Sequence, residues 1–488
     1  MKNAGKYLIL LLLSITVLQS CEDHDDQKVP NDLAVNDFVW KGLNLYYLWQ
    51  ADVADLADSR FSDQNDLNSF LYGHSDPKNL FQHLLFKPKS LFPESQAIDR
   101  FSVISSDYIE LEGVLSGTTK NNGVDFALYY KTGSTTEVFG VVRYILPNSD
   151  AALKDIRRGD LFYAVNGVSL SAQNYSDLLG NDNYTLNLAD FNAGNITPNG
   201  RSVALTKSIL SENPVYLNKI IVSGSHKIGY LVYNGFYPNY ETQLNNAFAE
   251  LKAAGITDFV LDLRYNSGGS VATATNLASM ITGQFSGQVF AKEQWNQKAE
   301  DYFISHGSNE LYNYFGNTIN TGAAINALNV TKMYVLTTKA TASASELVIN
   351  GLEPYINVIQ IGDKTIGKNV GSITLYDSPT FAKKDVNRSH RYAMQPLVLK
   401  IVNKNGFGDY TNGLDPDFLL KENLENFGIL GDESEPLLQL AISKIIGSAP
   451  KMSNNQEQSF RDFKNSKSIH LGGNDMYVDK IPTGFNKF

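Results

Sequence analysis

The stretch Thr341-Ala-Ser-Ala-Ser-Glu346 decides the fold of this 488-residue chain. Residues 332–338 before it contain an apolar run that predicts a buried strand, and residues 344–355 repeat apolar side chains at helical spacing. Ser343 at this junction would lie beside a helix N-terminus, where unpaired N–H groups and the helix dipole favour a developing negative charge. Serine is also a common helix cap, so this stretch alone fits either a nucleophile or a plain helix start.

A nucleophilic serine needs a base nearby, and Lys368 is the candidate. The chain has seven histidines, but none stands in a recognisable catalytic context, and no Gly-x-Ser-x-Gly elbow surrounds Ser343. Lys368 follows Gly367 and stands 25 residues after Ser343, behind a strand predicted over residues 358–361. A lysine accepts a proton only in its neutral form, which burial away from water favours.

A third segment follows another predicted strand, residues 258–263. Residues 262–269 read Asp-Leu-Arg-Tyr-Asn-Ser-Gly-Gly. Paired glycines at a strand end allow backbone N–H groups to turn toward a substrate carbonyl. A plainer interpretation is a strand-end turn held by an ion pair between Asp262 and Arg264, and both interpretations can hold together.

These three segments together resemble the C-terminal processing peptidases, or tail-specific proteases, and the resemblance covers residues 100–445. It implies that Ser343 is the nucleophile and Lys368 the general base of a Ser–Lys dyad. It implies a serine endopeptidase that hydrolyses protein or peptide substrates, near or guided by their C-termini. No cofactor and no metal are implied.

The same resemblance assigns the surrounding site. It implies an oxyanion hole in which the N–H group of Gly268 or Gly269 joins that of Ala344. Many relatives carry a glutamine four residues after the lysine, which orients it, and Ser372 stands at that place here. The implied fold class is α/β, with a ClpP/crotonase-like peptidase core over residues 215–450, where predicted strands and helices alternate.

Residues 100–212 change to short β runs. The stretch from Ser149 through Arg-Gly-Asp160 to Asn166-Gly167 resembles a PDZ domain; a generic small β domain with Asn-Gly turns is the alternative. Gly123-Val-Asp-Phe126 is the nearest candidate for a loop that binds a peptide carboxylate. Residues 34–98 predict a small helical N-terminal region, and residues 451–488 predict a polar tail.

The N-terminus predicts export and a lipid anchor. Residues 1–20 combine two lysines with an apolar run too short to span a bilayer, as in a signal peptide. Leu18-Gln-Ser-Cys21 resembles a bacterial lipobox, which implies lipidation of Cys21 behind a polar linker, residues 21–33. The predicted location is the bacterial cell envelope, with the protein on the outer membrane, periplasmic or surface-exposed. An ordinary secretory signal with an incidental cysteine is the alternative.

Bulk composition limits the number of domains and the classes of function that remain possible. The length predicts two to four domains, and a single cysteine excludes an internal disulfide. The net charge is −10 without a basic run, so nucleic acid is not an expected partner. Two functions remain as rivals to the peptidase. They are a non-catalytic lipid-anchored protein that binds peptides or glycans, and a lipase or esterase that uses the same serine.

Overall fold

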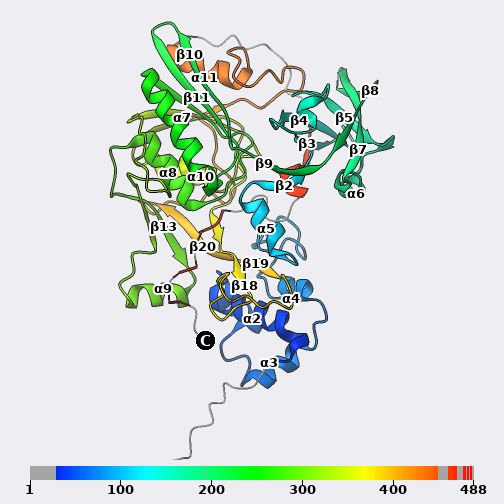
Figure 1. The fold of residues 1–488 in the computed structure, drawn as a ribbon, viewed down its shortest axis with the longest axis vertical. Coiled ribbons are helices and arrows are strands. Elements are labelled where there is room, and N and C mark those ends of the chain that lie inside the picture. The colour runs from blue at the N-terminus through cyan, green and yellow to red at the C-terminus, as the bar shows by residue number, and fades with distance from the viewer. Residues whose placement is uncertain are drawn as a thin grey trace, which may run out of the picture.

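The computed structural model describes residues 29–192, 194–448, 460–469, 476–479, 481–482 and 484–485. Figure 1 shows a helical N-terminal region in blue, a β-rich part in teal and an α/β part in green to yellow. The predicted signal peptide and Cys21 lie outside the described residues. Within the part that is described, no helix is long and apolar enough to cross a bilayer.

The N-terminal region is built of short helices, as predicted. Asp63 and Asp76 cap two of them, because each carboxylate accepts N–H groups of the first turn. The helices are η2 (Asn31–Leu33), α2 (Ala34–Tyr46), η3 (Gln50–Asp52), η4 (Ala54–Leu56), α3 (Gln64–Leu71) and α4 (Pro77–His83). Phe38 on α2 packs against Phe381, so this region shares a core with the later part of the chain.

The α/β part is built on a six-stranded sheet in the order β10-β11-β12-β15-β16-β21. Its strands are Val215–Ser223, His226–Tyr233, Asp258–Asp262, Lys332–Thr337, Asn357–Gly362 and Phe418–Leu419. Only the β10–β11 pair is antiparallel. β12 and β15 are parallel neighbours, so residues 262–269 and 341–346 meet at the same edge of the sheet.

Helices cover both faces of this sheet. Helices α7 (Glu241–Ala254), α8 (Val271–Thr282) and α10 (Ala344–Leu352) share one core with Leu231, Leu261 and Val335, whereas α11 (Pro436–Ile446) packs on the opposite face against Tyr230, Val260 and Leu336. Successive strand residues therefore face opposite cores, which explains the continuous apolar runs over residues 259–261 in β12 and 333–336 in β15.

Two smaller sheets extend the α/β part. The first has the order β14-β13-β20-β17, with bounds Tyr312–Tyr314, Val289–Trp295, Leu397–Asn403 and Val370–Ser372, and α9 (Gln297–Ser305) follows β13. The second comprises β1 (Val103–Ser105), β19 (Ala393–Gln395) and β18 (Leu375–Tyr376). Pro396, which lacks an N–H group, lies between β19 and β20.

The β-rich part is an antiparallel sheet in the order β22-β3-β4-β5-β7-β8, with β6 beside β5. Its elements are β3 (Val124–Tyr130), β4 (Val138–Ile145), η5 (Ala151–Leu153), β5 (Leu161–Val165), β6 (Val168–Ser169), α6 (Tyr175–Gly180), β7 (Asn183–Asn192) and β8 (Asn195–Thr206). Asn166 and Gly167 both have positive φ and join β5 to β6, so the predicted Asn-Gly turn is confirmed. The α5 helix (Tyr108–Leu115) and the β2–β9 ribbon (Thr118–Asn121, Ser208–Ser211) connect this part to the rest.

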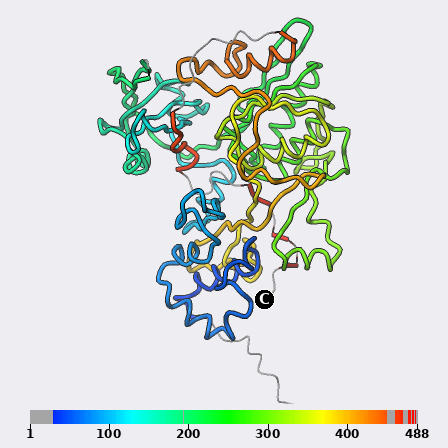
Figure 2. Tube along the Cα trace, turned by 180° about the vertical axis from the view of Figure 1, so that it is seen from behind, coloured from blue at the N-terminus to red at the C-terminus, as the bar shows by residue number. Residues whose placement is uncertain are grey.

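The C-terminal tail was predicted as a polar tail, but its described residues include a strand and a short helix. β22 (Asp462–Asn465) pairs with β3, η7 (Lys467–Ile469) follows, and residues 476–479 lie against the α/β part. Figure 2 shows the first of these pieces, in red, beside the β-rich sheet.

Candidate active site

Ser343 lies at the start of α10, where β15 has just ended. It has a φ of 67°, an uncommon value for a residue with a side chain. The residue is fully buried, and its Oγ has no hydrogen-bond partner among the described residues. The hydroxyl that the sequence predicts as a nucleophile thus makes no hydrogen bond there, while Glu346 accepts the Ser343 N–H as in a capping box.

Glu346, one turn into α10, joins the serine to the segment of Lys368. Its Oε2 accepts the N–H groups of Ser343 at 2.7 Å and of Lys368 at 2.8 Å. Its Oε1 accepts the N–H of Gly367 at 2.6 Å and the hydroxyl of Thr365. Burial raises the pKa of this carboxyl above its usual range, while the four donors act in the opposite direction.

Lys368 is fully buried, as a lysine base requires. Its Nζ lies 4.8 Å from the ring centre of Phe101. The neighbouring Arg100 donates to the carbonyl oxygen of Gly367 at 2.6 Å. Residues 100–101, at the end of the helical region, therefore cover the loop that carries the lysine.

The paired glycines lie directly against the serine. A Cβ atom on Gly268 would lie 2.6 Å from Ser343 Cβ and 2.9 Å from its Oγ, and one on Gly269 would lie 2.4 Å from Phe236 O. Both glycines have positive φ, 112° and 137°. Only glycine fits at either position, and the backbone of Gly268 contacts the side chain of Ser343.

Asn266 organises the backbone between the glycines and the serine. Its Oδ1 accepts the N–H of Gly268 at 2.9 Å, and its carbonyl oxygen accepts from Ala342 N–H at 3.1 Å and Ser345 Oγ at 3.0 Å. Within the described part of the chain, the N–H groups of Gly269 and Ala344 donate no hydrogen bond. Two donors, one directly after Ser343 in the chain and one directly after Gly268, are thus available to a ligand.

The predicted ion pair between Asp262 and Arg264 is confirmed. Their side chains approach to 2.8 Å with both fully buried. Arg264 also binds Glu435 on the N-cap of α11, at 2.7 Å, and Glu422, at 3.2 Å. These carboxylates hold the pKa of Arg264 well above its ordinary value against the effect of burial. The network fixes the turn that carries the glycines.

Ser372 is buried on β17, four residues after Lys368. Its Oγ lies 3.1 Å from the carbonyl oxygen of Met476 and 3.3 Å from Oε1 of Gln395. A hydroxyl has one proton, so Ser372 donates to one of these acceptors. A role of Ser372 in orienting the lysine stays a prediction.

The sequence names Ser343, Ala344, Gly268, Gly269 and Lys368, and the structure brings their segments together. Three further residues were not given a role from sequence: Glu346, Asn266 and Gln395. Glu346 and Asn266 belong to the motifs quoted above, but a motif does not show which atoms of its residues form hydrogen bonds. Gln395 comes from a distant strand, and no local pattern marks it.

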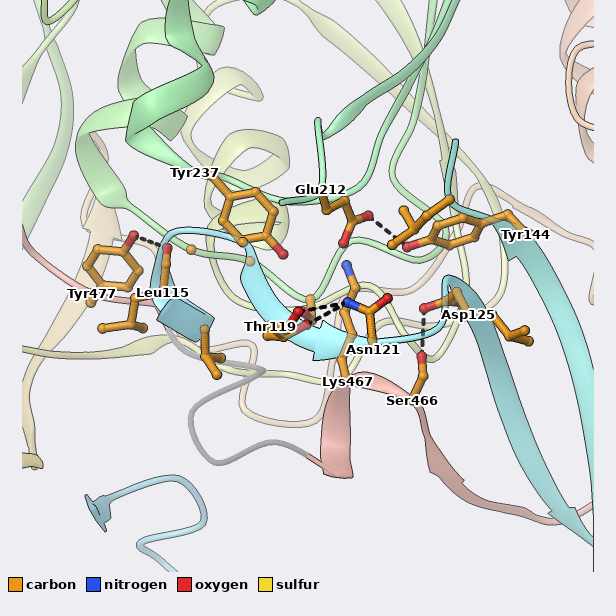
Figure 3. A pocket seen from close by; sticks show the side chains of 17 residues that line it. Leu115, Thr119, Asn121, Asp125, Tyr144, Glu212, Tyr237, Ser466, Lys467 and Tyr477 are labelled. Carbon is orange, nitrogen blue, oxygen red and sulfur yellow. Dashed lines mark hydrogen bonds between the residues drawn. The ribbon is translucent and has the colours of Figure 1, made fainter. Parts of the chain in front are cut away.

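A cavity of about 90 Å³ adjoins Gly268 and Gly269, between the β-rich and α/β parts. Figure 3 shows its polar lining, which includes Asp125, Glu212 and Lys467. Burial raises the pKa of the Glu212 carboxyl, which accepts the Tyr144 hydroxyl at 2.9 Å. The cavity connects the predicted carboxylate loop with the glycine pair.

Residues 227–388 match the family described as Peptidase family S41, and residues 34–103 match the Peptidase S41 N-terminal domain. The first match contains the glycine pair, Ser343 and Lys368. The second coincides with the helical N-terminal region.

Curated relatives share parts of the chain. It is 27% identical over 260 residues to the chloroplastic C-terminal processing peptidase of Tetradesmus obliquus, which covers 51% of each protein. It is 24% identical over 303 residues to the carboxyl-terminal-processing protease of Picosynechococcus sp., over 61% of this chain and 64% of that one. The chain thus spans between half and two thirds of the length of these relatives.

Two solved structures have a similar fold. A Bacteroides fragilis protein assigned to the S41 proteases is 25% identical, with a TM-score of 0.63 over 86% of this chain and 98% of that one. The photosystem II D1 C-terminal processing protease is 19% identical, with a TM-score of 0.50 over 84% of this chain and all of that one. The second likeness concerns the fold alone.

Proposed function

We propose, from the premise that this chain is a serine-type peptidase of family S41 with a mixed α/β fold, that it is an endopeptidase whose catalytic dyad is Ser343 and Lys368. The observation that carries the proposal is Glu346, because one oxygen of its carboxylate accepts the backbone N–H groups of both dyad residues. The predicted resemblance to C-terminal processing peptidases is confirmed at the level of the family.

The mechanism follows from the dyad. Neutral Lys368 takes the proton of Ser343 Oγ while the oxygen attacks the carbonyl carbon of a peptide bond. The departing amine takes a proton from Lys368, which leaves an ester on Ser343. Water then gives a proton to Lys368 and attacks the ester, and the acid product leaves as Ser343 recovers its proton.

The oxyanion hole is proposed at Gly269 and Ala344. The Ala344 N–H follows Ser343 directly in the chain, the Gly269 N–H follows Gly268, which lies against the serine, and neither donates another hydrogen bond within the described residues. The N–H of Gly268 already donates to Asn266. Gly268 instead makes room for the serine side chain, and the free N–H of Ala344 at the helix N-terminus stabilises the developing charge.

The β-rich part is proposed to be a PDZ-like module that guides substrates by their C-termini, joined to a ClpP/crotonase-like core. The sequence pattern from Ser149 to Gly167 supports this, as does the position of the Gly123–Phe126 loop at the cavity beside the glycine pair. Peptides ending in a free carboxylate and an apolar residue should bind more tightly than amidated ones, because a charge-assisted hydrogen bond is lost. Equal affinity in fluorescence anisotropy would leave this part without carboxylate recognition.

We further propose that the protein is anchored in the bacterial cell envelope by a lipid on Cys21. This proposal rests on the lipobox-like sequence and on the position of the sole cysteine.

The dyad is tested by cleavage of an unfolded protein by folded single variants. Ser343→Ala should abolish cleavage, and Lys368→Ala should nearly do so. Lys368→Arg should also fail, because a guanidinium stays charged and cannot accept the serine proton.

Ser345→Ala is the matched control. Ser345 lies two residues from the nucleophile and gives up only a hydrogen bond to Asn266 O, worth about 1 kcal/mol. Its cleavage rate should stay close to that of the wild type. Full activity of Ser343→Ala would refute the dyad, and a folded wild type that binds peptides without cleaving them would favour the binding protein.

A further inference from the structure

The C-terminal tail adds a strand to the edge of the β-rich sheet. β22 pairs antiparallel with β3, with Asn465 opposite Ala127. The Ser466 N–H extends the ladder by donating to Phe126 O at 2.9 Å. Without β22, β3 would present an unpaired edge, and such an edge accepts another extended peptide.

Aromatic contacts seat this strand between β3 and α6. The ring centre of Phe463 lies 5.0 Å from that of Tyr130 on β3 and 5.0 Å from that of Tyr175 on α6. Ile469 packs partly buried against the same core. An extended peptide that joins a sheet edge and places a side chain in a neighbouring pocket uses the recognition mode of PDZ domains.

The strand also runs in the direction of a ligand. Because it is antiparallel to β3, its later residues approach the start of β3 and the Gly123 loop. Ser466 Oγ donates to Asp125 Oδ2 at 2.7 Å, as Figure 3 shows. Lys467, next in the chain, lines the cavity that leads to the glycine pair.

A second piece of the tail lies between the glycine segment and β17. Tyr477 pairs on one side with the glycine segment, since its N–H donates to Gly269 O at 3.2 Å and its carbonyl oxygen accepts from Val271 at 3.0 Å. On the other side, Ser372 N–H donates to Met476 O at 2.9 Å. An extended strand of the protein itself therefore lies between the glycine pair and β17, which follows Lys368.

We propose that this C-terminal segment, residues 460–469 and 476–479, is an internal ligand that occupies both peptide-binding grooves and inhibits the enzyme. The inference rests on the proposed function for the catalytic groove. Protein substrates with an extended C-terminus would have to displace it. The backbone bonds that hold it are of the kind an extended substrate makes, so exchange costs few hydrogen bonds.

The β22 part of the segment is held weakly enough to exchange. Asp462 and Lys464 on β22 face solvent, and the Lys339–Asp462 ion pair is about half exposed on both sides. Exposed pairs of this kind contribute on the order of 0–1 kcal/mol. Phe463 is the main apolar anchor on β22, and it is only partly buried.

A disulfide lock tests the inhibition. Ala127→Cys with Asn465→Cys, in a Cys21→Ser background, joins two residues that lie opposite in the register, where a disulfide can form. The oxidised protein should cleave unfolded protein about tenfold more slowly than the same protein after reduction. A matched pair, Asn183→Cys with Thr206→Cys on opposed residues of β7 and β8, should show no such difference.

A binding experiment separates this inference from the catalytic proposal. In a Ser343→Ala background, a fluorescent peptide copying residues 460–469 should bind weakly, because the groove is filled. Phe463→Ala with Ser466→Pro removes the anchor and one ladder N–H, and should raise the affinity of that peptide about tenfold. Leu153→Ala, at an exposed leucine of the same part, is the control and should change nothing.

The outcomes are distinct. Equal cleavage by the oxidised and reduced proteins, or equal peptide affinity with and without the release substitutions, would overturn the internal ligand. If neither redox form cleaves, the catalytic proposal fails, while peptide affinity still decides whether the tail fills the groove.

Discussion

The backbone of Ser343 adopts a conformation that costs on the order of 1–3 kcal/mol for a residue with a side chain. Two neighbours hold it there. Glu346 accepts its N–H group, and the missing side chain of Gly268 leaves space for its hydroxyl. At the scale of single residues, the geometry of the site thus depends on the buried carboxylate of Glu346 and on Gly268, whose missing side chain leaves space for the serine.

Glu346→Ala should lower kcat far more than it changes KM. The substitution leaves three backbone N–H groups without their acceptor and frees the loop of Lys368 from α10. A misplacement of about 1 Å at a reacting group costs about 100-fold in rate. Steady-state cleavage of a quenched peptide measures both constants.

The kcat of Glu346→Gln should fall between those of the wild type and Glu346→Ala, because one oxygen of the side chain still accepts hydrogen bonds. Glu353→Ala, at the far end of α10, is the control and should keep the wild-type kcat. If Glu346→Ala raised KM and left kcat unchanged, Glu346 would not position the dyad.

The elements that were predicted from sequence are those with an uninterrupted pattern. The strands predicted over residues 258–263 and 332–338 contain continuous apolar runs, residues 259–261 in β12 and 333–336 in β15. α8 has no such pattern, because small and hydroxyl side chains fill it. Thr275, Ser279 and Thr282 bond to carbonyl oxygens four residues earlier and can therefore be buried, which hydropathy does not reveal.

Glu293 on β13 makes stability depend on pH. Burial raises the pKa of its carboxyl to about 7, and Asn313 and Trp295 are its donors. Between pH 4.5 and 7 the unfolded chain ionises this group while the folded protein keeps it protonated, so stability falls as pH rises through this window. The loss should reach about 3 kcal/mol at most.

Urea unfolding at pH 5 and pH 8 checks this prediction. Glu293→Gln cannot ionise, so its free energy of unfolding should rise relative to the wild type between the two conditions. Glu110→Gln, at an exposed glutamate, should follow the wild type at both. If the free energies of unfolding of Glu293→Gln and of the wild type changed equally between pH 5 and pH 8, the raised pKa of Glu293 would be contradicted.

At the scale of the whole molecule, the tail shows the limit of local patterns. Its residues are rich in Lys, Asn and Ser, and the four residues of β22 are too few for a clear alternation. They form a strand because β3 offers an unpaired edge, more than 300 residues away in sequence. The dyad, in contrast, was predicted because its residues stand in motifs whose spacing matches a family.

The proposed lipid anchor at Cys21, which lies outside the described residues, would tie the whole molecule to a membrane. η2 begins at Asn31, so residues 22–30 separate Cys21 from the folded body. At about 3.5 Å for each extended residue, the body would remain within about 35 Å of the bilayer. A diacylated cysteine gives stable membrane binding, and an unmodified residue gives none.

Cys21→Ala should therefore move the protein from the detergent phase to the aqueous phase in Triton X-114 partition, or leave an uncleaved precursor on a gel. Ser20→Ala keeps a small residue before the cysteine and should partition like the wild type. If the wild type and Cys21→Ala partition identically as mature proteins, the N-terminus is an ordinary secretory signal, and the body would act on substrates free of the membrane.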